Sequence, residues 1–218
     1  MPSRAAVVTA AIGDPVRLRL LQELIAGPAA VSELVRRLKA GQSNVSNHLS
    51  LLRAAGLVGS RRRGRLIEYA LAGPAVAQLV EVLSSLAGPP PAARRAELAE
   101  ARTCYDHLAG RLGVALFDRL TESGAIVDEH RSGVLRLGPH ANEVFGRLGV
   151  ALGRLPRSRR RFAFRCLDWT ERRPHLGGAL GAEVARAFER QGWTRRRPRS
   201  RRLDAAPRAW RALTASGA

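Results

Sequence analysis

Apolar residues recur at helical spacing in three consecutive stretches near the N-terminus. Asp14 and Pro15 open the first stretch, since Asp is a good N-cap and Pro suits a first helical turn. The second stretch begins at about Ala30, and the third runs from about Ser43 to Ala55 after a tight turn. The inward positions are Leu18, Leu21, Leu24, Ile25, Val31, Leu34, Val35, Leu38, Val45, Leu49 and Leu52. The pattern predicts three packed helices, of which the last two form a helix-turn-helix.

Two short apolar runs follow, at 57–58 and 66–71, and they flank the basic, glycine-containing stretch 59–65. This arrangement is typical of a β-hairpin. Pro74 then starts a further helix, while residues 4–12 are interpreted only as a short apolar stretch. The order of elements predicts a winged helix-turn-helix.

A stiff break at Gly88–Pro91 is the predicted domain boundary. It separates a first domain, residues 1–88, from a C-terminal region, residues 92–218. Aromatic residues make up only 5% of the chain, so the cores must consist of Leu, Val and Ala, which favours helices. The predicted fold class is mainly α with small β-hairpins (α+β).

The third helix carries polar side chains of the kind that read DNA. Gln and Asn can pair with two atoms of an adenine edge, and Ser can bond to bases or phosphate, while Val45 and Leu49 hold the helix to its core. Arginines on the hairpin suit phosphate or the minor groove. The predicted DNA-binding residues are Gln42, Ser43, Asn44, Ser46, Asn47, His48, Arg53, Arg61, Arg62, Arg63 and Arg65. An ordinary polar helix face and a solvated charge run are the alternatives.

Three blocks of this region resemble the ArsR/SmtB-type family of dimeric repressors: Asp14–Leu21, Ser32–Leu34 and Gln42–Val58. The resemblance covers about residues 5–87. It implies a winged-helix homodimer that binds palindromic operators in double-stranded DNA and releases them on sensing an effector. It implies a dimer interface built by the first helix and the helix at about 75–87. It also implies that the readers of bases and backbone are Ser43, Asn44, Ser46, Asn47 and His48.

The sequence departs from the two metal sites familiar in this family. Many members bind metal through cysteines in the helix before the turn, where this chain has Ala30–Leu34 without a cysteine. Others use His and carboxylate pairs on the helix after the wing, where Ala75–Leu86 offers only Glu81. Metal sensing at these two places is therefore not expected.

Charge is spread unevenly over the chain, whose net charge is +19. Residues 1–90 carry 11 basic and 5 acidic residues, residues 91–153 carry 8 of each, and residues 154–218 carry 18 and 5. A field this positive attracts polyanions. The basic stretch 195–202 is interpreted as a second nucleic-acid contact or as a solvated surface.

Other classes of protein are disfavoured. No apolar run is long enough for a bilayer and no signal pattern opens the chain, so we expect a soluble, cytoplasmic protein without a membrane partner. The cysteines lie in no nucleophile motif and no phosphate-cradling glycine loop is present, so an enzyme is not expected. The alternative to an effector-released repressor is an architectural or constitutive nucleic-acid-binding protein that senses nothing.

The C-terminal region contains an internal repeat. The segment His107–Gly113 recurs, shifted by 68 residues, as His175–Gly181. The shared positions are His107/His175, Leu108/Leu176, Gly110/Gly178, Leu112/Leu180, Gly113/Gly181 and Gly124/Gly192. We predict two repeats, about 101–153 and 162–216, each a degenerate winged unit of helix, two strands and helix. A chance alignment of Leu-, Gly- and Arg-rich sequence is the alternative.

Each predicted repeat supplies one cysteine and one histidine. Cys104 with His107, and Cys166 with His175, are expected near helix starts, and the first pair is expected on one helical face. A pseudo-twofold packing of the repeats would bring the four together as a Cys2His2 site for zinc or another soft metal. The carboxylates expected to orient these ligands are Asp106 and Asp168.

Three other interpretations of these residues stay open, and no cofactor is certain. A cysteine at a helix start suits a thiol switch. An organic effector bound between the repeats would use Tyr105 and Trp169 as aromatic walls, beside Asp106 and Asp168. The cysteines are otherwise small buried apolar side chains. The blocks Arg102–Gly110 and Cys166–His175 also resemble a long-chain subgroup of these regulators that has a C-terminal extension.

Overall fold

The structure, a computed structural model, describes residues 2–25, 27–86, 96, 98–129, 134–155, 161–198 and 200–214. The chain forms two compact units, which are described separately. The first unit comprises residues 1–83 with 198–201, and the second comprises residues 84–197 with 202–218. The predicted break at Gly88–Pro91 and the last two positions of the predicted second repeat, 215–216, lie outside the described residues.

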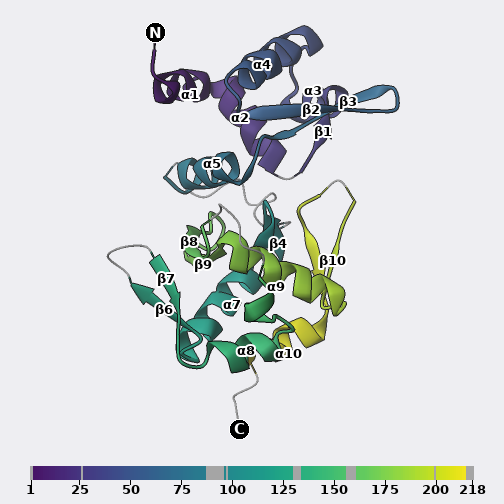
Figure 1. The fold of residues 1–218 in the computed structure, drawn as a ribbon. Coiled ribbons are helices and arrows are strands. Elements are labelled where there is room, and N and C mark those ends of the chain that lie inside the picture. Colours follow the sequence, from purple (N-terminus) through teal and green to yellow (C-terminus); the bar gives the residue numbers. More distant parts are fainter. Residues whose placement is uncertain are drawn as a thin grey trace. The chain divides into compact units, whose positions relative to one another are not determined.

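The first unit is a winged helix-turn-helix (Figure 1). Its elements are α1 (Arg4–Ile12), α2 (Pro15–Ile25), β1 (Ala29–Ala30), α3 (Val31–Leu38), α4 (Gln42–Ala54), β2 (Val58–Arg63), β3 (Leu66–Leu71) and α5 (Pro74–Leu86). The strands form one antiparallel sheet in the order β1-β3-β2. The predicted helices α2, α3 and α4 and the hairpin are therefore confirmed.

The apolar stripe of each helix builds the core of this unit. Leu21, Leu34, Leu49 and Leu52 are completely buried. The backbone N–H groups of Val16 and Arg17 each donate to Oδ1 of Asp14 at 2.9 Å, which is the predicted N-cap of α2. This capping satisfies donors that the helix itself leaves without partners.

Three details differ from the sequence-based interpretation. Residues 4–12 form the helix α1 rather than an irregular stretch, and residues 29–30 add the short strand β1. The strand β2 continues to Arg63, so the turn of the hairpin is only Gly64-Arg65. Arg61, Arg62 and Arg63 are extended because they pair with Leu66–Glu68 of β3, although arginine has no strong strand preference.

The second unit contains two successive sets of hairpin, helix, hairpin and helix (Figure 1). The first set is β4 (Arg102–Cys104), β5 (His107–Ala109), α7 (Gly110–Glu122), β6 (Ile126–Glu129), β7 (Val134–Leu137) and α8 (Ala141–Arg147), followed by the short 3-10 helix η1 (Leu152–Arg154). The second set is β8 (Phe164–Leu167), β9 (Pro174–Gly177), α9 (Gly178–Arg190), β10 (Thr194–Arg196), β11 (Leu203–Ala205) and α10 (Pro207–Thr214).

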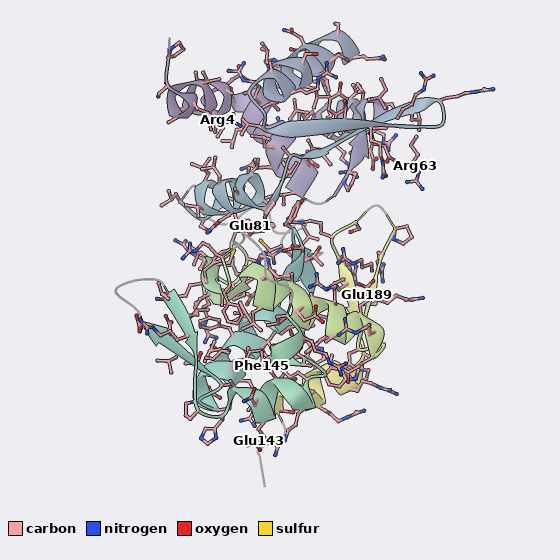
Figure 2. The ribbon with its side chains drawn as sticks, viewed as in Figure 1. Arg4, Arg63, Glu81, Glu143, Phe145 and Glu189 are labelled. Carbon is pink, nitrogen blue, oxygen red and sulfur yellow. The ribbon has the colours of Figure 1, made fainter. Side chains whose placement is uncertain are left out.

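The strands of the second unit pair across the two sets. Hairpins β6–β7 and β8–β9 join into a four-stranded sheet through Val134 and Phe164. Hairpins β4–β5 and β10–β11 meet through an antiparallel bridge between Arg102 and Arg202. Phe145, labelled in Figure 2, lies completely buried in the core that these elements enclose.

The predicted order of helix, two strands and helix is incomplete, because a hairpin precedes the long helix in each set. Gly110 and Gly178 begin α7 and α9 with φ of +73° and +91°. A backbone in that region cannot continue a right-handed helix from the preceding residues, so the chain enters each helix from a strand. Within the described ranges, no helix combines the length and apolar character that a membrane crossing requires.

Candidate nucleic-acid interface and metal centre

Helix α4 is divided into a buried face and a polar face. Val45, Leu49 and Leu52 are completely buried, which fixes the rotation of the helix against its core. The predicted reading residues Gln42, Ser43, Asn44 and Asn47 are exposed, and Ser46 is half-buried. The helix therefore presents amide and hydroxyl groups to the outside on a rigid base.

His48 differs from the other predicted reading residues. Its side chain is only 14% exposed, and its Nδ1 lies 3.7 Å from Oδ1 of Asp14. The imidazole thus lies against the start of α2. His48 is therefore half-buried between α4 and the start of α2, whereas Asn47 is exposed.

The hairpin β2–β3 carries its arginines outward. Arg61 and Arg63 have side chains that are 78% and 60% exposed, although both lie within 4 Å of the buried carboxylate of Glu68. Figure 2 labels Arg63 beside the hairpin β2–β3. Arg62 and Arg65 are also exposed. Because one carboxylate faces several guanidinium groups, the hairpin keeps a positive surface.

Arg53 links the two predicted DNA-binding elements. It lies in the last turn of α4, and its Nη1 donates to the hydroxyl of Ser60 on β2 at 3.3 Å. Helix α4 and the hairpin β2–β3 are therefore joined directly. Because one N–H of the Arg53 guanidinium already donates to Ser60, its remaining N–H groups are the donors left for a phosphate.

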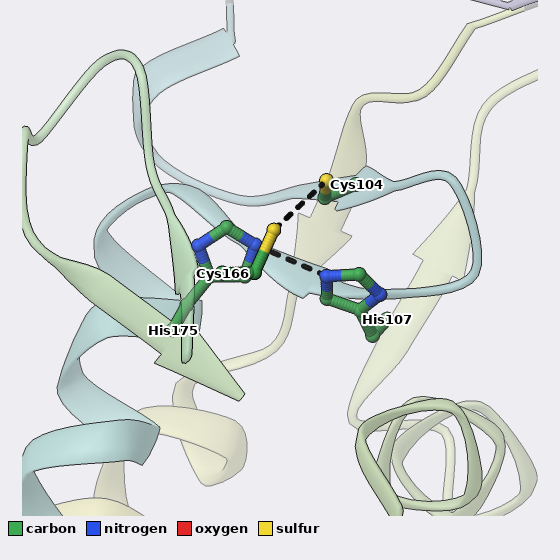
Figure 3. A group of neighbouring side chains, drawn as sticks. All are labelled: Cys104, His107, Cys166 and His175. Carbon is green, nitrogen blue, oxygen red and sulfur yellow. Dashed lines mark hydrogen bonds between the residues drawn. The ribbon is translucent and has the colours of Figure 1, made fainter. Parts of the chain in front are cut away.

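The second unit brings the four predicted metal ligands together. Cys104 pairs with His107 across the hairpin β4–β5, and Cys166 pairs with His175 across the hairpin β8–β9. Directly opposed residues of an antiparallel pair place their side chains on the same face. Figure 3 shows that both hairpins direct these side chains toward one another. All four are at most 4% exposed, and their ligand atoms lie within 4.8 Å of one another.

The predicted helical setting of Cys104 and His107 is wrong. The two residues close a two-residue turn, Tyr105-Asp106, in which Tyr105 has φ +60°. The three-residue spacing that suits a helical face also suits a tight hairpin, where the first and last residues of the turn are cross-strand partners. The four side chains still converge, because the hairpin β4–β5 also places Cys104 and His107 on one face.

The distances within the cluster are short. Sγ of Cys104 lies 3.8 Å from Sγ of Cys166, and Nε2 of His107 lies 3.2 Å from Nε2 of His175. Burial lowers the pKa of His107, but the neighbouring Cys104 and the Asp106 carboxylate outweigh burial and raise this pKa to about 9.

Both predicted orienting carboxylates lie beside the outer nitrogen of a histidine. Oδ1 of Asp106 lies 3.3 Å from Nδ1 of His107, and Oδ2 of Asp168 lies 3.6 Å from Nδ1 of His175. Such carboxylates fix the tautomer and rotation of a metal-binding imidazole. The arrangement leaves Nε2 of each ring directed at the other.

Asp168 is buried in a polar network that the sequence did not reveal. Oδ2 lies 3.0 Å from Nη2 of Arg102, and both side chains are fully buried. The same carboxylate accepts hydrogen bonds from the N–H groups of Gly110 and Thr170. Burial would raise the pKa of Asp168, but the charges of Arg102 and His175 hold it far below its usual range. Arg102 is one of 36 arginines and carried no local signal.

The two predicted effector walls lie in different surroundings. Trp169 is only 5% exposed, and the guanidinium carbon of Arg102 lies 5.1 Å from the centre of its ring. Tyr105 is 39% exposed in the turn of β4–β5. The face of Trp169 is thus occupied by a protein side chain.

Two glycines of the repeated segment make the cluster compact. A Cβ on Gly113 would lie 2.5 Å from the backbone oxygen of Leu108 and 3.6 Å from Cβ of His175. A Cβ on Gly181 would lie 2.2 Å from the backbone oxygen of Leu176 and 3.2 Å from Cβ of His107. Each long helix therefore lies close to the backbone of the hairpin that precedes it only because it has a glycine there. The repetition of both glycines was the available sequence signal.

The fold and the exposed face of α4 define the class of protein as a transcriptional regulator with a winged helix-turn-helix. Residues 14–60 match the family described as "Bacterial regulatory protein, arsR family". The chain is 31% identical over 215 residues to the "Uncharacterized HTH-type transcriptional regulator YdfF" of Bacillus subtilis (strain 168), covering 93% of this chain and 92% of that protein. The chain belongs to the ArsR family of transcriptional regulators.

Two shorter likenesses concern the first unit alone. The "Probable mercury resistance operon repressor" of Streptomyces lividans is 38% identical over 86 residues, which are 39% of this chain and 69% of that protein. The solution structure of the "homodimeric winged helix-turn-helix DNA-binding domain (fragment 1-100) Mb0332 from Mycobacterium bovis" matches with 31% identity and a TM-score of 0.38, over 38% of this chain and 78% of that one.

Proposed function

We propose that this protein is a homodimeric repressor that binds a palindromic operator in double-stranded DNA through α4 and the hairpin β2–β3. The observation that carries the proposal is the polar face of α4, where Asn44 and Asn47 are exposed above a completely buried apolar stripe. The arginines of the adjoining hairpin supply phosphate contacts. In this arrangement the helix reads base edges in the major groove, and the wing holds the register on the backbone.

Two helices of the winged fold leave apolar side chains uncovered in a single chain. Helix α1 has no buried residue, and its Val7 is 40% exposed. On α5, Val82 and Leu86 are 38% and 79% exposed. A second copy that covers these helices would bury this surface. The family resemblance implies a dimer interface that includes the helix at about 75–87, which is α5. We add α1 to that interface, because residues 4–12 form a helix in the structure.

The C-terminal region is the proposed effector region, built from two repeats. Both sets of elements have the same order, and each long helix packs on the hairpin of the other set: α7 on β9 and α9 on β5. The pairing of β7 with β8 is matched by the bridge that joins β4 to β11. This twofold correspondence supports a duplication in which the two copies share one core, whereas a chance alignment would give no reason for it.

The test is footprinting of the full chain on the promoter next to its gene, with the variants Asn47→Ala and Arg62→Ala. We expect Asn47→Ala to lower specific binding by ~5- to 100-fold, since one bidentate base contact contributes about 1–3 kcal/mol of discrimination, and to leave nonspecific binding unchanged. Arg62→Ala should weaken both kinds of binding alike and reduce the dependence of affinity on salt.

Asn142→Ala is the matched control, since Asn142 is exposed on α8 of the second unit. It should leave the footprint unchanged. Equal loss of specific and nonspecific binding in Asn47→Ala would contradict the reading role of α4. Binding without sequence preference, together with a steep salt dependence, would instead identify an architectural nucleic-acid-binding protein.

A further inference from the structure

The Cys/His cluster, meaning Cys104, His107, Cys166 and His175, has a composition and shape that suit one chemical class of ligand. The four donors come from two hairpins that are far apart in the sequence, and every one is buried. We propose that the Cys/His cluster is a four-coordinate binding site for a thiophilic divalent cation of the zinc class. This site lies outside the winged unit that carries the proposed DNA contacts.

Two distances within the Cys/His cluster match a tetrahedron. Zinc–sulfur distances of about 2.3 Å and zinc–nitrogen distances of about 2.0–2.1 Å place two sulfurs ~3.8 Å apart and two nitrogens ~3.3 Å apart at tetrahedral angles. The two sulfurs lie 3.8 Å apart and the two Nε2 atoms lie 3.2 Å apart. The sulfur pair and the nitrogen pair are thus each spaced as in a tetrahedral site, and all four donor atoms lie within 4.8 Å of one another.

The orientation of the histidines also suits a cation. Asp106 lies beside Nδ1 of His107 and Asp168 lies beside Nδ1 of His175, and the two rings turn their Nε2 atoms toward each other. These Nε2 atoms lie 3.2 Å apart, a position in which they share a hydrogen bond in the absence of an ion. A cation bound there would replace that hydrogen bond and be coordinated by both nitrogens.

The donor set selects the ion. Two thiolates and two imidazoles favour zinc and softer cations over magnesium or calcium, which prefer oxygen ligands. Binding converts each thiol to a thiolate, so the Sγ–H bonds break, the Sγ–metal bonds form and two protons pass to solvent. Since all four ligands belong to the protein, no open position remains for a substrate, and the ion links the hairpin β4–β5 to the hairpin β8–β9.

A disulfide between Cys104 and Cys166 is the competing chemistry at this place. It would break two Sγ–H bonds, form one Sγ–Sγ bond and pass two electrons to an oxidant, and it would leave both histidines without a role. The proposed ion uses all four side chains. Control of DNA binding by the ion is a second step, and that step rests on the proposed function as a repressor.

The experiment titrates the metal-free, reduced full chain with Co²⁺ and Zn²⁺. We expect one ion per chain by native mass spectrometry, with Co²⁺ giving sulfur-to-metal charge-transfer bands and the visible bands of a tetrahedral site. Cys104→Ser and Cys166→Ser should each lose the charge-transfer intensity of one thiolate and bind the ion far more weakly. His140→Ala is the matched control, because His140 is exposed and lies outside the cluster, and it should bind like the natural chain.

Asp106→Asn provides a variant that keeps all four ligands. Loss of an orienting carboxylate typically weakens a metal site by ~10- to 100-fold, and we expect that reduction for Zn²⁺ with the tetrahedral spectrum retained. Circular dichroism checks that each variant is folded. A folded chain that retains no ion and shows no tetrahedral Co²⁺ spectrum would overturn the proposal. So would Co²⁺ spectra that are identical in the natural chain and in the double variant Cys104→Ser/Cys166→Ser.

The regulatory step is read separately, from operator binding with and without Zn²⁺. Release of DNA by Zn²⁺ in the natural chain, absent in Cys104→Ser, would support metal control. Tight Zn²⁺ binding with unchanged DNA binding would uphold the site and overturn its regulatory use. Metal binding without any specific DNA binding would uphold the site and contradict the proposed function.

Discussion

The two units of this regulator hold their candidate functional side chains in opposite environments. On α4 of the first unit, Asn44 and Asn47 stand exposed on a helix whose other face is completely buried. In the second unit, Cys104 and His175 belong to a cluster in which every side chain is buried. Exposed polar groups on a rigid base suit a large polyanion that arrives from solvent, whereas convergent buried donors suit an ion that the protein encloses.

The same contrast predicts different links between function and stability. Ion pairs on the hairpin, such as Arg61 with Glu68, involve an arginine that is mostly exposed and contribute little. The pair of Arg102 with Asp168 is fully buried, so removing one partner leaves an uncompensated charge. Changes to the DNA-reading face should therefore alter binding without unfolding, while changes around the Cys/His cluster should alter folding.

The largest expected effect is that of metal removal on the second unit. Zinc held by thiolates and imidazoles contributes on the order of 10 kcal/mol in small peptides at pH 7. We expect a chelator to lower the melting temperature of the second unit by ~10 °C or more, because the ion links two hairpins. Hydrogen exchange of the full chain should show lost protection in β5 and β9 and unchanged protection in α4.

Cys104→Ser sharpens this test. In that variant the chelator should have little further effect, because the ion is already bound weakly. If the chelator lowered hydrogen-exchange protection in α4 as much as in β5, the prediction that only the second unit depends on the ion would be wrong. An unchanged exchange pattern in every segment of the natural chain would show that the second unit does not depend on an ion.

Arg102→Met should give the next largest effect, a loss of about 3–5 kcal/mol in the free energy of unfolding of the second unit. The substitution leaves the buried carboxylate of Asp168 without its guanidinium partner, which lies at 3.0 Å. Denaturant unfolding measures the loss. Arg136→Met is the matched control, because Arg136 is 69% exposed and its pair with Glu129 should contribute only ~0–1 kcal/mol. Equal losses in both variants would contradict the assigned role of burial.

Much of the first unit could be predicted from the sequence because its signals are local. Apolar residues at helical spacing, the Asp14 cap and the polar residues before Leu49 each report on a few neighbouring positions. The feature that the sequence pattern missed, the position of His48, depends on tertiary packing. His48 shares the polar face of α4 in the sequence, yet its contact with Asp14 depends on how α4 packs on α2.

The second unit was predictable only in part, because its organisation depends on long-range contacts. The repeated His and Gly positions pointed to this region, and the sequence predicted that Cys104, His107, Cys166 and His175 converge, which the structure shows. The spacing of Cys104 and His107 could not distinguish a helical face from a two-residue turn. The partner of Asp168 could not be found at all, because Arg102 lies 66 positions away and resembles every other arginine in a basic chain.

A smaller effect is expected from adding a side chain between a long helix and the hairpin that precedes it. Gly181→Ala should destabilise the second unit by about 1–3 kcal/mol, because the new Cβ would lie 2.2 Å from the backbone oxygen of Leu176. Gly146→Ala, on α8, meets nothing within 4 Å and should stabilise the unit by roughly 0.5–1 kcal/mol. Thermal unfolding of both variants is the measurement, and a shared sign would contradict the close approach at Gly181.

The smallest expected effect is the acid sensitivity of the Asp14 cap in the first unit. The backbone N–H of Arg17, with the nearby charges of Arg17 and His48, holds the pKa of Asp14 below its usual value. Because the folded state favours the carboxylate, this stabilisation is present above about pH 4 and is lost as the pH falls through the lowered pKa. Asp14→Asn keeps an oxygen that accepts the N–H groups but cannot titrate, so unfolding of α2 should respond less to a change from pH 7 to pH 3. Hydrogen exchange of α2 measures the difference, and an identical response in both proteins would assign the acid sensitivity to other carboxylates.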